Sequence, residues 1–475
     1  MKRIICLLLL LVLVVGLCAC GSSDSGGKKG LQVGFARESI TPQYTVCLQG
    51  GAYKERISTG MLDMLYITCI AITDGEQTYL LYTMDVKLAT GNFAPETRAQ
   101  VAAATGIPFE NIYLNATHTH SGVAIRYNWD NADRYRTDFA KAAVKSAQKA
   151  VADIAPAEVS IGTTMTNKMA WVRHYNMADG TVAGSNFGNT SSGYVSHVLD
   201  ADNELQLIRF TRSPGEDGKE KKDIVLASFP AHATFNEGGT DLSADFPGPF
   251  RDYVEKNANV LCAYFIGAAG NQTPSSRIQG EAFSRNYRDY GAELGRYAVE
   301  ALPTLTKIEN TELKATVGSY TGATHKENTS PERVAQAQEV TQTVNAYGAK
   351  APETLAIVAE YGFSSRIEAS WVIKRASLED TRTMELKAFA IGDLSFIFAS
   401  YEMSGIQGQY IKEHTPYDMT FVVTCSEGDN SYIPTAEAFD YNSYESQCSY
   451  WARGTAEILA DEFVKVLTQL KGEAE

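Results

Sequence analysis

Length, composition and charge exclude several classes of protein. The chain has 475 residues, of which 44% are hydrophobic and 21% charged, as in a globular protein with an ample core. Its formal net charge of −14 argues against nucleic acid as a partner and against adhesion of its surface to an anionic membrane. The length allows one large domain or about two to three smaller ones.

Residues 1–20 have the pattern of a bacterial lipoprotein signal peptide. Positively charged residues precede the apolar run Ile4–Leu17, which is shorter than a membrane-spanning helix needs. The run ends in Leu-Cys-Ala-Cys20, which resembles a lipobox, so we expect lipid on the Cys20 sulfur; an ordinary secretory signal is the alternative. Residues 21–30 then form a flexible tether. We therefore expect an extracytoplasmic protein, lipid-anchored to the bacterial cell membrane, with its body in residues 31–475.

The body alternates strand-like and helix-like stretches, which is typical of an α/β fold. Thr78–Val86, Pro95–Thr105 and Asn111–Thr117 predict a β-α-β unit with right-handed parallel pairing. Tight turns are predicted at Ala178-Asp179-Gly180 and at Gly392-Asp393. No internal repeat or Pro/Ser-rich linker divides the body. One large α/β domain with mixed β-sheets covered by helices is therefore the simplest prediction.

Other elements are predicted from hydrophobic periodicity and from capping and turn residues. Further strands are expected at Gln32–Ala36, Met64–Thr73, Asp223–Phe229, Val260–Ile266, Thr311–Ser319, Thr383–Ile391, Leu394–Phe398 and Thr420–Cys425. Further helices are expected at Thr137–Ile154, Asp289–Leu302, Ser330–Ala346, Pro352–Tyr361 and Ser449–Leu470. The last is amphipathic, with one side formed by Ile458, Leu459, Phe463, Val466 and Leu467.

Two histidines follow directly on the strand at Asn111–Thr117. The chain has only seven histidines, so His118 and His120 within three positions are unusual. Side chains at i and i+2 of an extended segment share one face, so both rings can point into one pocket. One metal ligand plus one acid/base group fits this pattern, and a pair of histidines bonded to nearby carbonyls fits it equally well.

Three potential ligands occupy equivalent places in the predicted strands. His118, His232 and Glu402 each follow an apolar strand near its C-terminal end, where open α/β sheets collect reactive groups. Two histidines and one carboxylate are a recurrent catalytic zinc set that leaves a position for water. A core histidine and a glutamate at a helix N-terminus are the alternatives, but the shared placement favours a metal site.

The cysteines do not indicate a thiolate metal site. Beyond the leader the chain has Cys47, Cys69, Cys262, Cys425 and Cys448, without CxxC spacing. An odd number leaves at least one free thiol, and Cys425 and Cys448 are the candidates for a disulfide.

The residues around these positions resemble the neutral/alkaline ceramidases, zinc-dependent amidases of sphingolipid metabolism that cut the N-acyl bond of ceramide. The resemblance spans roughly the whole body. Its most specific motif is Ala116-Thr-His-Thr-His-Ser-Gly122. Looser motifs follow in the family's order, namely Ala231-His-Ala-Thr234, Ser243-Ala-Asp245, Gly270-Asn-Gln-Thr-Pro274, Tyr401-Glu-Met403 and Tyr432–Tyr444.

This resemblance implies roles for individual residues. It assigns Zn²⁺ to His118, His232, Glu402 and Tyr432. It gives His120 a role as acid/base or as a partner that positions a ligand. Tyr444 would contact the reacting carbonyl, and Arg173, in Met169-Ala-Trp-Val-Arg-His174, would steady the oxyanion.

The chain departs from the family pattern in two places. The family's nucleophilic serine is replaced by Thr273, and the preceding aspartate by Asn271. Either Thr273 attacks, or metal-activated water attacks while both residues position the substrate; we favour water. The chain also ends without a counterpart of the family's C-terminal β-sandwich domain, which weakens the expectation of ceramide as substrate.

The sequence therefore predicts a zinc-dependent amidohydrolase for a ceramide-like lipid or another N-acylated amine. A zinc hydrolase for other envelope amides or esters is the second hypothesis. A metal- or lipid-binding lipoprotein without catalysis is the third, since the serine-to-threonine change could have removed the chemistry.

Overall fold

The computed structural model describes residues 30–49, 56–184, 193–215, 218–278, 280–281 and 286–472. Cys20, the signal peptide and nearly all of the predicted tether lie outside these residues. Within them, no helix combines the length and apolar character needed to cross a membrane.

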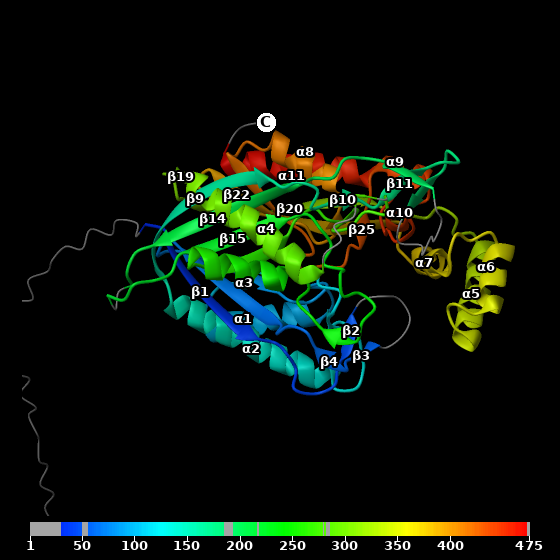
Figure 1. Cartoon of the computed structure of the whole chain (residues 1–475), viewed down its shortest axis with the longest axis horizontal. Coiled ribbons are helices and arrows are strands. Elements are labelled where there is room, and N and C mark those ends of the chain that lie inside the picture. The colour runs from blue at the N-terminus through cyan, green and yellow to red at the C-terminus, as the bar shows by residue number, and fades with distance from the viewer. Residues whose placement is uncertain are drawn as a thin grey trace, which may run out of the picture.

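A nine-stranded mixed sheet forms the centre of the fold (Figure 1). Two of its strand pairs are parallel, β6–β7 and β15–β17, and the others are antiparallel. The predicted β-α-β unit is present as β6, α1 (Phe93–Thr105) and β7. The strand order is β17 (Leu261–Ile266), β15 (Ile224–Phe229), β14 (Glu204–Arg212), β9 (Ala155–Met165), β1 (Gln32–Ser39), β5 (Tyr66–Thr73), β6 (Thr78–Met84) and β7 (Ile112–Ala116), with β19 (Thr306–Ile308) paired to β9.

A four-stranded sheet packs against the large one. Its order is β20 (Leu313–Ala323), β21 (Thr381–Ile391), β22 (Leu394–Phe398) and β24 (Met419–Val423). The predicted turn Gly392-Asp393 joins β21 to β22, and β22 runs parallel to β24. Apolar side chains of both sheets share one core, in which Phe389, Phe396 and Phe421 meet residues such as Ile70 and Leu226.

Helices cover the outer face of each sheet (Figure 1). The two sheets and two helical layers form an α/β/β/α sandwich, which confirms the predicted α/β class with mixed sheets covered by helices. The large sheet is covered by α1, α2 (Ala132–Ala152), α3 (Pro247–Ala258) and α4 (Tyr287–Ala301), and the small sheet by α8 (Gly405–His414) and α11 (Thr455–Lys471).

Three helices between β20 and β21 form a separate small cluster at one end of the molecule (Figure 1). They are α5 (Pro331–Tyr347), α6 (Pro352–Glu360) and α7 (Arg366–Ala376). The Ser330 hydroxyl accepts from Arg333 N and Pro331 occupies the first turn of α5, as the capping pattern predicts.

Short elements connect the layers near the strand ends. The short strands are β2 (Cys47–Gln49), β3 (Arg56–Ile57), β4 (Gly60–Met61), β8 (Gly122–Val123), β10 (Trp171–Val172), β11 (His174–Met177), β12 (Val182–Gly184), β13 (Tyr194–His197), β16 (Asp241–Leu242), β18 (Gln272–Thr273), β23 (Glu402–Met403) and β25 (Tyr432–Ile433). The short helices are α9 (Ala436–Asp440) and α10 (Tyr444–Gln447), and 3₁₀ turns lie at Phe109–Asn111 and Leu302–Thr304.

The structure corrects three predictions. The last helix begins at Thr455 rather than Ser449, because the preceding residues form isolated β-bridges. Ile458 is 46% exposed and lies off the buried side of that helix. Cys425 and Cys448 are both free and buried, so the candidate disulfide is absent among the described cysteines.

Candidate active site

Three strands end at the place where the two sheets meet. His118 follows β7, His232 follows β15, and Glu402 follows β22. The chain after β24 connects the sheets there: Thr424 N donates to Ile266 O over 3.0 Å, and Ala116 N donates to Cys425 O over 3.2 Å. Backbone hydrogen bonds thus bring three distant segments of the sequence to one point.

Glu402 is placed beside Tyr432 by strand pairing. The two residues are register partners in the parallel pair β23–β25, and Glu402 N donates to Ser431 O over 2.9 Å. The turn after β17 packs against this pair, with Gly270 N donating to Met403 O over 2.6 Å. A Cβ at residue 270 would lie 2.6 Å from the Glu402 carbonyl oxygen, so only glycine permits this approach.

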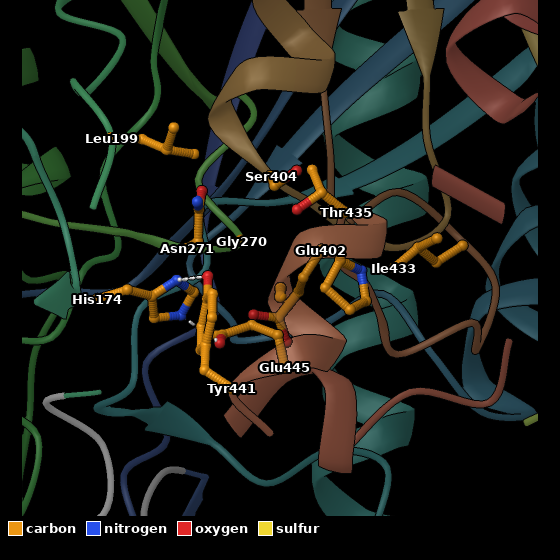
Figure 2. Close-up of a pocket in the computed structure, with 12 residues that line it drawn as sticks. His174, Leu199, Gly270, Asn271, Glu402, Ser404, Ile433, Thr435, Tyr441 and Glu445 are labelled. Carbon is orange, nitrogen blue, oxygen red and sulfur yellow. Dashed lines mark hydrogen bonds and ion pairs between the residues drawn. The ribbon is translucent and has the colours of Figure 1, made fainter. Parts of the chain in front are cut away.

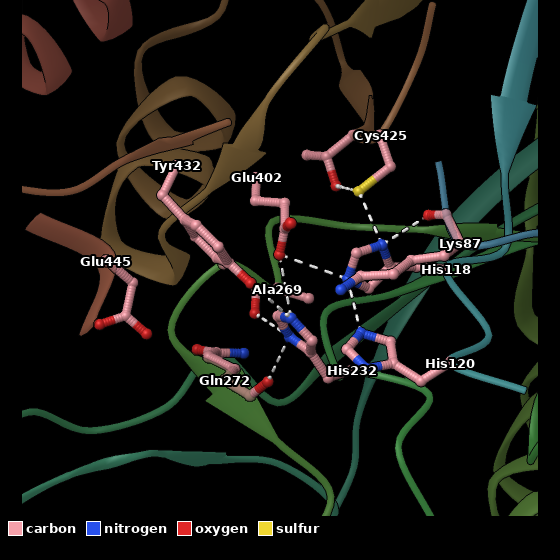
Figure 3. A network of polar contacts seen from close by, with 12 residues as sticks. Lys87, His118, His120, His232, Ala269, Gln272, Glu402, Cys425, Tyr432 and Glu445 are labelled. Carbon is pink, nitrogen blue, oxygen red and sulfur yellow. Dashed lines mark hydrogen bonds and ion pairs between the residues drawn. The ribbon is translucent and has the colours of Figure 1, made fainter. Parts of the chain in front are cut away.

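The predicted ligands form one buried cluster (Figure 3). Nε2 of His118 lies 3.3 Å from Nε2 of His120 and 3.3 Å from Oε2 of Glu402. The same Glu402 oxygen lies 3.0 Å from Nε2 of His232, and the Tyr432 hydroxyl lies 3.4 Å from that nitrogen. The potential ligand atoms of the three histidines lie within 4.8 Å of one another. His120 therefore lies within the donor set itself.

Each of the three imidazoles is oriented through its other nitrogen. When Nδ1 is bonded to an oxygen, the ring is fixed with Nε2 facing the cluster, as in most histidines that bind metals. The contacts are His118 Nδ1 to Lys87 O at 2.7 Å, His232 Nδ1 to Ala269 O at 2.7 Å, and His120 Nδ1 to Glu237 Oε1 at 2.9 Å.

Burial and neighbouring charges separate the pKa values of the rings. Burial lowers the pKa of His232 to about 4, with Arg173 adding to the effect, and lowers that of His120 well below its usual value. Burial acts on His118 as well, but the Cys425 sulfur and the Glu402 carboxylate outweigh it and raise the pKa of His118 to about 10. His118 therefore carries the proton that a bound cation would displace.

Backbone strain accompanies this geometry. His118, Cys425 and Ser431 have φ values of 64°, 53° and 55°, in the left-handed region that side chains other than glycine rarely adopt. Such residues persist where the surrounding structure enforces them, and they gather at functional sites.

Arg173 is held beside the cluster by an acidic residue. Its Nε and Nη2 each lie 2.7 Å from Glu445 Oε1, and Nη2 also donates to Gly270 O over 2.7 Å. Burial opposes ionisation of Glu445, but His174 and Arg173 outweigh it and lower the pKa of Glu445 to about 2. The guanidinium lies 5.6 and 5.7 Å from the ring centroids of Tyr432 and Tyr444.

The Glu445 network continues away from the imidazoles. His174 Nε2 lies 2.6 Å from Glu445 Oε2, and its Nδ1 lies 3.0 Å from the Tyr441 hydroxyl. These residues line a cavity of about 10 Å³ with Asn271 and Glu402 (Figure 2). A space of this size is about enough for one water molecule.

Tyr444 lines the cavity that opens on Glu402 and Tyr432. Its ring centroid lies 5.6 Å from that of Tyr432. The neighbouring Cys448 and burial raise the pKa of Tyr444 well above its usual value, so the phenol keeps its proton and can donate a hydrogen bond.

Thr273 and Asn271 have different surroundings. Thr273 lies in β18, paired with Trp171. The Asn271 side-chain oxygen accepts from Gly405 N over 2.9 Å, which fixes the start of α8 against the turn after β17.

With this geometry established, the chain can be compared with known proteins. No protein-family model matches it. The structure of neutral ceramidase from Pseudomonas aeruginosa superposes with a TM-score of 0.66 at 16% sequence identity, covering 94% of this chain and 76% of that one. A ceramidase complexed with C2 gives a TM-score of 0.66 at 16% identity, covering 93% of this chain and 75% of that one. The chain has the fold of neutral ceramidases. At this identity the likeness establishes the fold alone.

The donor set fits a divalent cation. Two ligands of one zinc ion, each about 2.1 Å from it, lie roughly 3.4 Å apart in tetrahedral geometry. The separations of 3.0 Å between His232 and Glu402, 3.3 Å between His118 and Glu402 and 3.3 Å between His118 and His120 are close to that value. Neutral imidazoles and one carboxylate are also suitable ligands chemically.

Sequence patterns did not indicate the residues that hold this set in place. Glu237 orients His120, Glu445 pairs with Arg173, and Cys425 lies 3.3 Å from His118 Nδ1. Glu445 adjoins Tyr444, and His174 adjoins Arg173. Their position next to predicted site residues was therefore the one feature of the sequence that could have indicated their roles. Glu237 lies in the turn after His232, where nothing in the sequence pattern distinguishes it.

Proposed function

We propose that the protein is a zinc-dependent amidohydrolase that cleaves an N-acyl amide bond. The observation that carries this proposal is the orientation of His118, His120 and His232, whose Nδ1 atoms are held by oxygens while their Nε2 atoms lie in one cluster with Glu402. The shared fold with ceramidase structures supports an amide as the substrate. Hydrolysis would break the C–N bond, with the OH of water going to the acyl carbon and its remaining proton to the amine.

The metal would be held by the three imidazoles, Glu402 and Tyr432, of which the phenol of Tyr432 would be the weakest ligand. When bound there, Zn²⁺ supplies Lewis-acid polarisation of the carbonyl and lowers the pKa of water. The proposed proton-transfer role of His120 stays a prediction, since its Nε2 lies among the donors and its Nδ1 is held by Glu237.

Residues beside the metal ligands would act on the reacting carbonyl. The protonated Tyr444 phenol would donate a hydrogen bond to the carbonyl oxygen as negative charge develops there. Arg173 would hold Tyr432 and Tyr444 in place through its contacts with both rings, while Glu445 balances its charge. Water is the nucleophile in this proposal, because a bound zinc ion would lower its pKa.

Alanine variants test the proposal. His118→Ala and His232→Ala should each lose bound zinc and the release of amine from a simple N-acyl amide, because both rings belong to the donor set. His414→Ala is the matched control, since this exposed histidine lies at the end of α8. Undiminished hydrolysis by both site variants would refute the proposal, and bound zinc without hydrolysis of any amide would favour a binding role.

We also propose that lipid on Cys20 anchors the protein outside the cytoplasmic membrane. The lipobox-like ending of the apolar run supports this. Cys20→Ser should abolish incorporation of labelled fatty acid and release the protein from the membrane fraction; labelling that persists would contradict it.

A further inference from the structure

A cavity of about 270 Å³ opens on the candidate metal site. Glu402, Tyr432 and Tyr444 contribute to its wall, so a substrate whose carbonyl reaches these residues must place part of itself in the cavity. This volume is slightly below the range for small-molecule sites, about 300–1,000 Å³. The cavity therefore suits a compact group.

The wall of the cavity is polar. Among the described residues that line it, only Leu88 has an aliphatic side chain; the others are aromatic, hydroxyl, amide, thiol or charged. A long hydrocarbon chain gains free energy by leaving water for apolar surroundings, and here the six aromatic rings and Leu88 are interspersed with charged and hydrogen-bonding groups. The cavity therefore suits a polar part of the substrate.

The cations that line the cavity outnumber its carboxylates by three to two. They are Lys87, Arg126 and Lys374, whereas the carboxylates of the wall are Asp429 and the metal-site residue Glu402. No described carboxylate forms an ion pair with the ammonium of Lys87 or Lys374, and Arg126 Nη1 lies 3.8 Å from Asp429. In a chain of net charge −14, this local excess of positive charge does not follow from composition.

Contacts inside the wall hold two of these cations in place. Lys374 Nζ lies 4.4 Å from the Trp371 ring centroid and 4.6 Å from that of Tyr450. Arg126 Nη1 bonds to Thr90 Oγ1 at 3.0 Å, which leaves other guanidinium donors for a ligand. Cations positioned in this way recognise a carboxylate through charge-assisted hydrogen bonds.

We propose that this cavity binds an anionic group of the substrate, and that the preferred substrates are N-acyl amides carrying a carboxylate, as in an N-acylated amino acid. The inference rests on the proposed amidohydrolase function. Arg126 and Lys374 determine the specificity, and Lys87, whose carbonyl also holds His118, contributes positive charge next to the metal ligands.

Two matched compounds test the inference with the full-length protein. N-octanoylglycine carries a carboxylate, and N-octanoylglycinamide is its uncharged counterpart. The ratio of their kcat/KM values should favour the carboxylate by roughly ten- to a hundredfold, and this preference should shrink as ionic strength rises. A ratio near one, or a preference for the uncharged compound, would overturn the inference while leaving the proposed function intact.

Variants locate the preference within the cavity. Arg126→Gln and Lys374→Gln should each lower the ratio about tenfold without loss of bound zinc. Lys374→Arg should retain the preference, which separates loss of charge from loss of folding. Lys141→Gln removes the same charge from an exposed position on α2 and should leave the ratio unchanged.

Binding separates this inference from the function on which it rests. Calorimetric titration of both compounds should give tighter binding of N-octanoylglycine, dependent on Arg126 and Lys374, even if neither compound is hydrolysed. Binding with that dependence but without turnover would refute the proposed function and retain the anion site. Equal affinity for the two compounds would refute the anion site.

Discussion

Glu402 and Tyr432 are register partners in a two-residue parallel strand pair, and both reach the same nitrogen of His232. One oxygen of Glu402 also contacts His118. This pairing couples a carboxylate and a phenol at a single point of the imidazole cluster. Their chemistry differs, however, because burial and the Glu402 charge raise the pKa of Tyr432 well above its usual value.

Substitutions of these partners should therefore have unequal effects. Glu402→Gln should weaken zinc binding by more than roughly a hundredfold, because it removes the charged ligand shared by His118 and His232. Tyr432→Phe should weaken binding much less, because its protonated phenol is a poor ligand. Competition with a chromogenic chelator measures both affinities; equal losses would contradict this ranking.

Glu237 should influence zinc binding without touching the metal. It fixes the Nδ1 of His120, and loss of such a partner typically lowers metal affinity about 10–100-fold. We expect a loss of this size for Glu237→Gln. Glu281→Gln is the matched control, since Glu281 contacts His197 outside the cluster. If both variants bind zinc like the wild type, the assigned orientation of His120 is wrong.

Zinc binding should release a proton at pH 7. The pKa of His118 is raised to about 10, chiefly because Cys425 and Glu402 outweigh burial, whereas a metal ligand must be neutral. Zinc affinity should therefore fall as the pH falls. Calorimetric titrations in buffers of different ionisation enthalpy count the protons released, and a heat that is independent of the buffer would contradict the prediction.

The raised pKa of His118 should also make the stability of the metal-free protein depend on pH. A pKa raised above the usual value of 6.5 means that the folded state binds the proton more tightly than the unfolded state. This contribution to stability is fully present below pH 6.5 and is lost as the pH rises towards about 10. Urea unfolding of zinc-free protein at several pH values should show this loss, and His118→Gln should remove that part of the pH dependence.

Glu445→Gln should destabilise the fold as well as the site. It removes the carboxylate that the Nε and Nη2 atoms of the buried Arg173 contact, and breaking a buried pair in this way costs about 3–5 kcal/mol. The pKa of Glu445 is lowered from 4.5 to about 2, so its contribution is present above pH 4.5 and is lost as the pH falls towards 2. Wild type and variant should therefore converge in unfolding free energy over that range.

A surface pair provides the control for this measurement. Glu300→Gln removes the partner of Arg296 on the exposed face of α4 and should change stability little, because solvent screens such pairs. If Glu445→Gln is no more destabilising than Glu300→Gln, the ion pair with Arg173 does not stabilise the fold.

Local patterns in the sequence predicted much of the fold. Apolar runs of strand length correctly indicated β6, β7, β15, β17 and β22, and the turn residues Gly392-Asp393 correctly indicated a hairpin. The long strands β9 and β14 were missed. In β9 the reason is that buried and exposed positions alternate with small residues, so that no apolar run forms. The packing of one sheet on the other depends on distant contacts, which periodicity does not encode.

The site was predictable where it depends on strand ends and not where it depends on turns. His118, His232 and Glu402 follow apolar strands, and parallel pairing brings such positions together. The resemblance to ceramidases, rather than spacing, pointed to Tyr432. Glu237 and Glu445 reach the site through turns whose direction is set by the folded chain, so their roles required the structure.

The most direct test of the metal site is a zinc titration of the full-length protein after removal of metal by a chelator. Bound zinc and the release of amine from an N-acyl amide are measured at each step. We predict negligible turnover without zinc, a linear rise in turnover up to one equivalent, and no further rise beyond it. Full turnover by the metal-free protein would contradict the proposed mechanism.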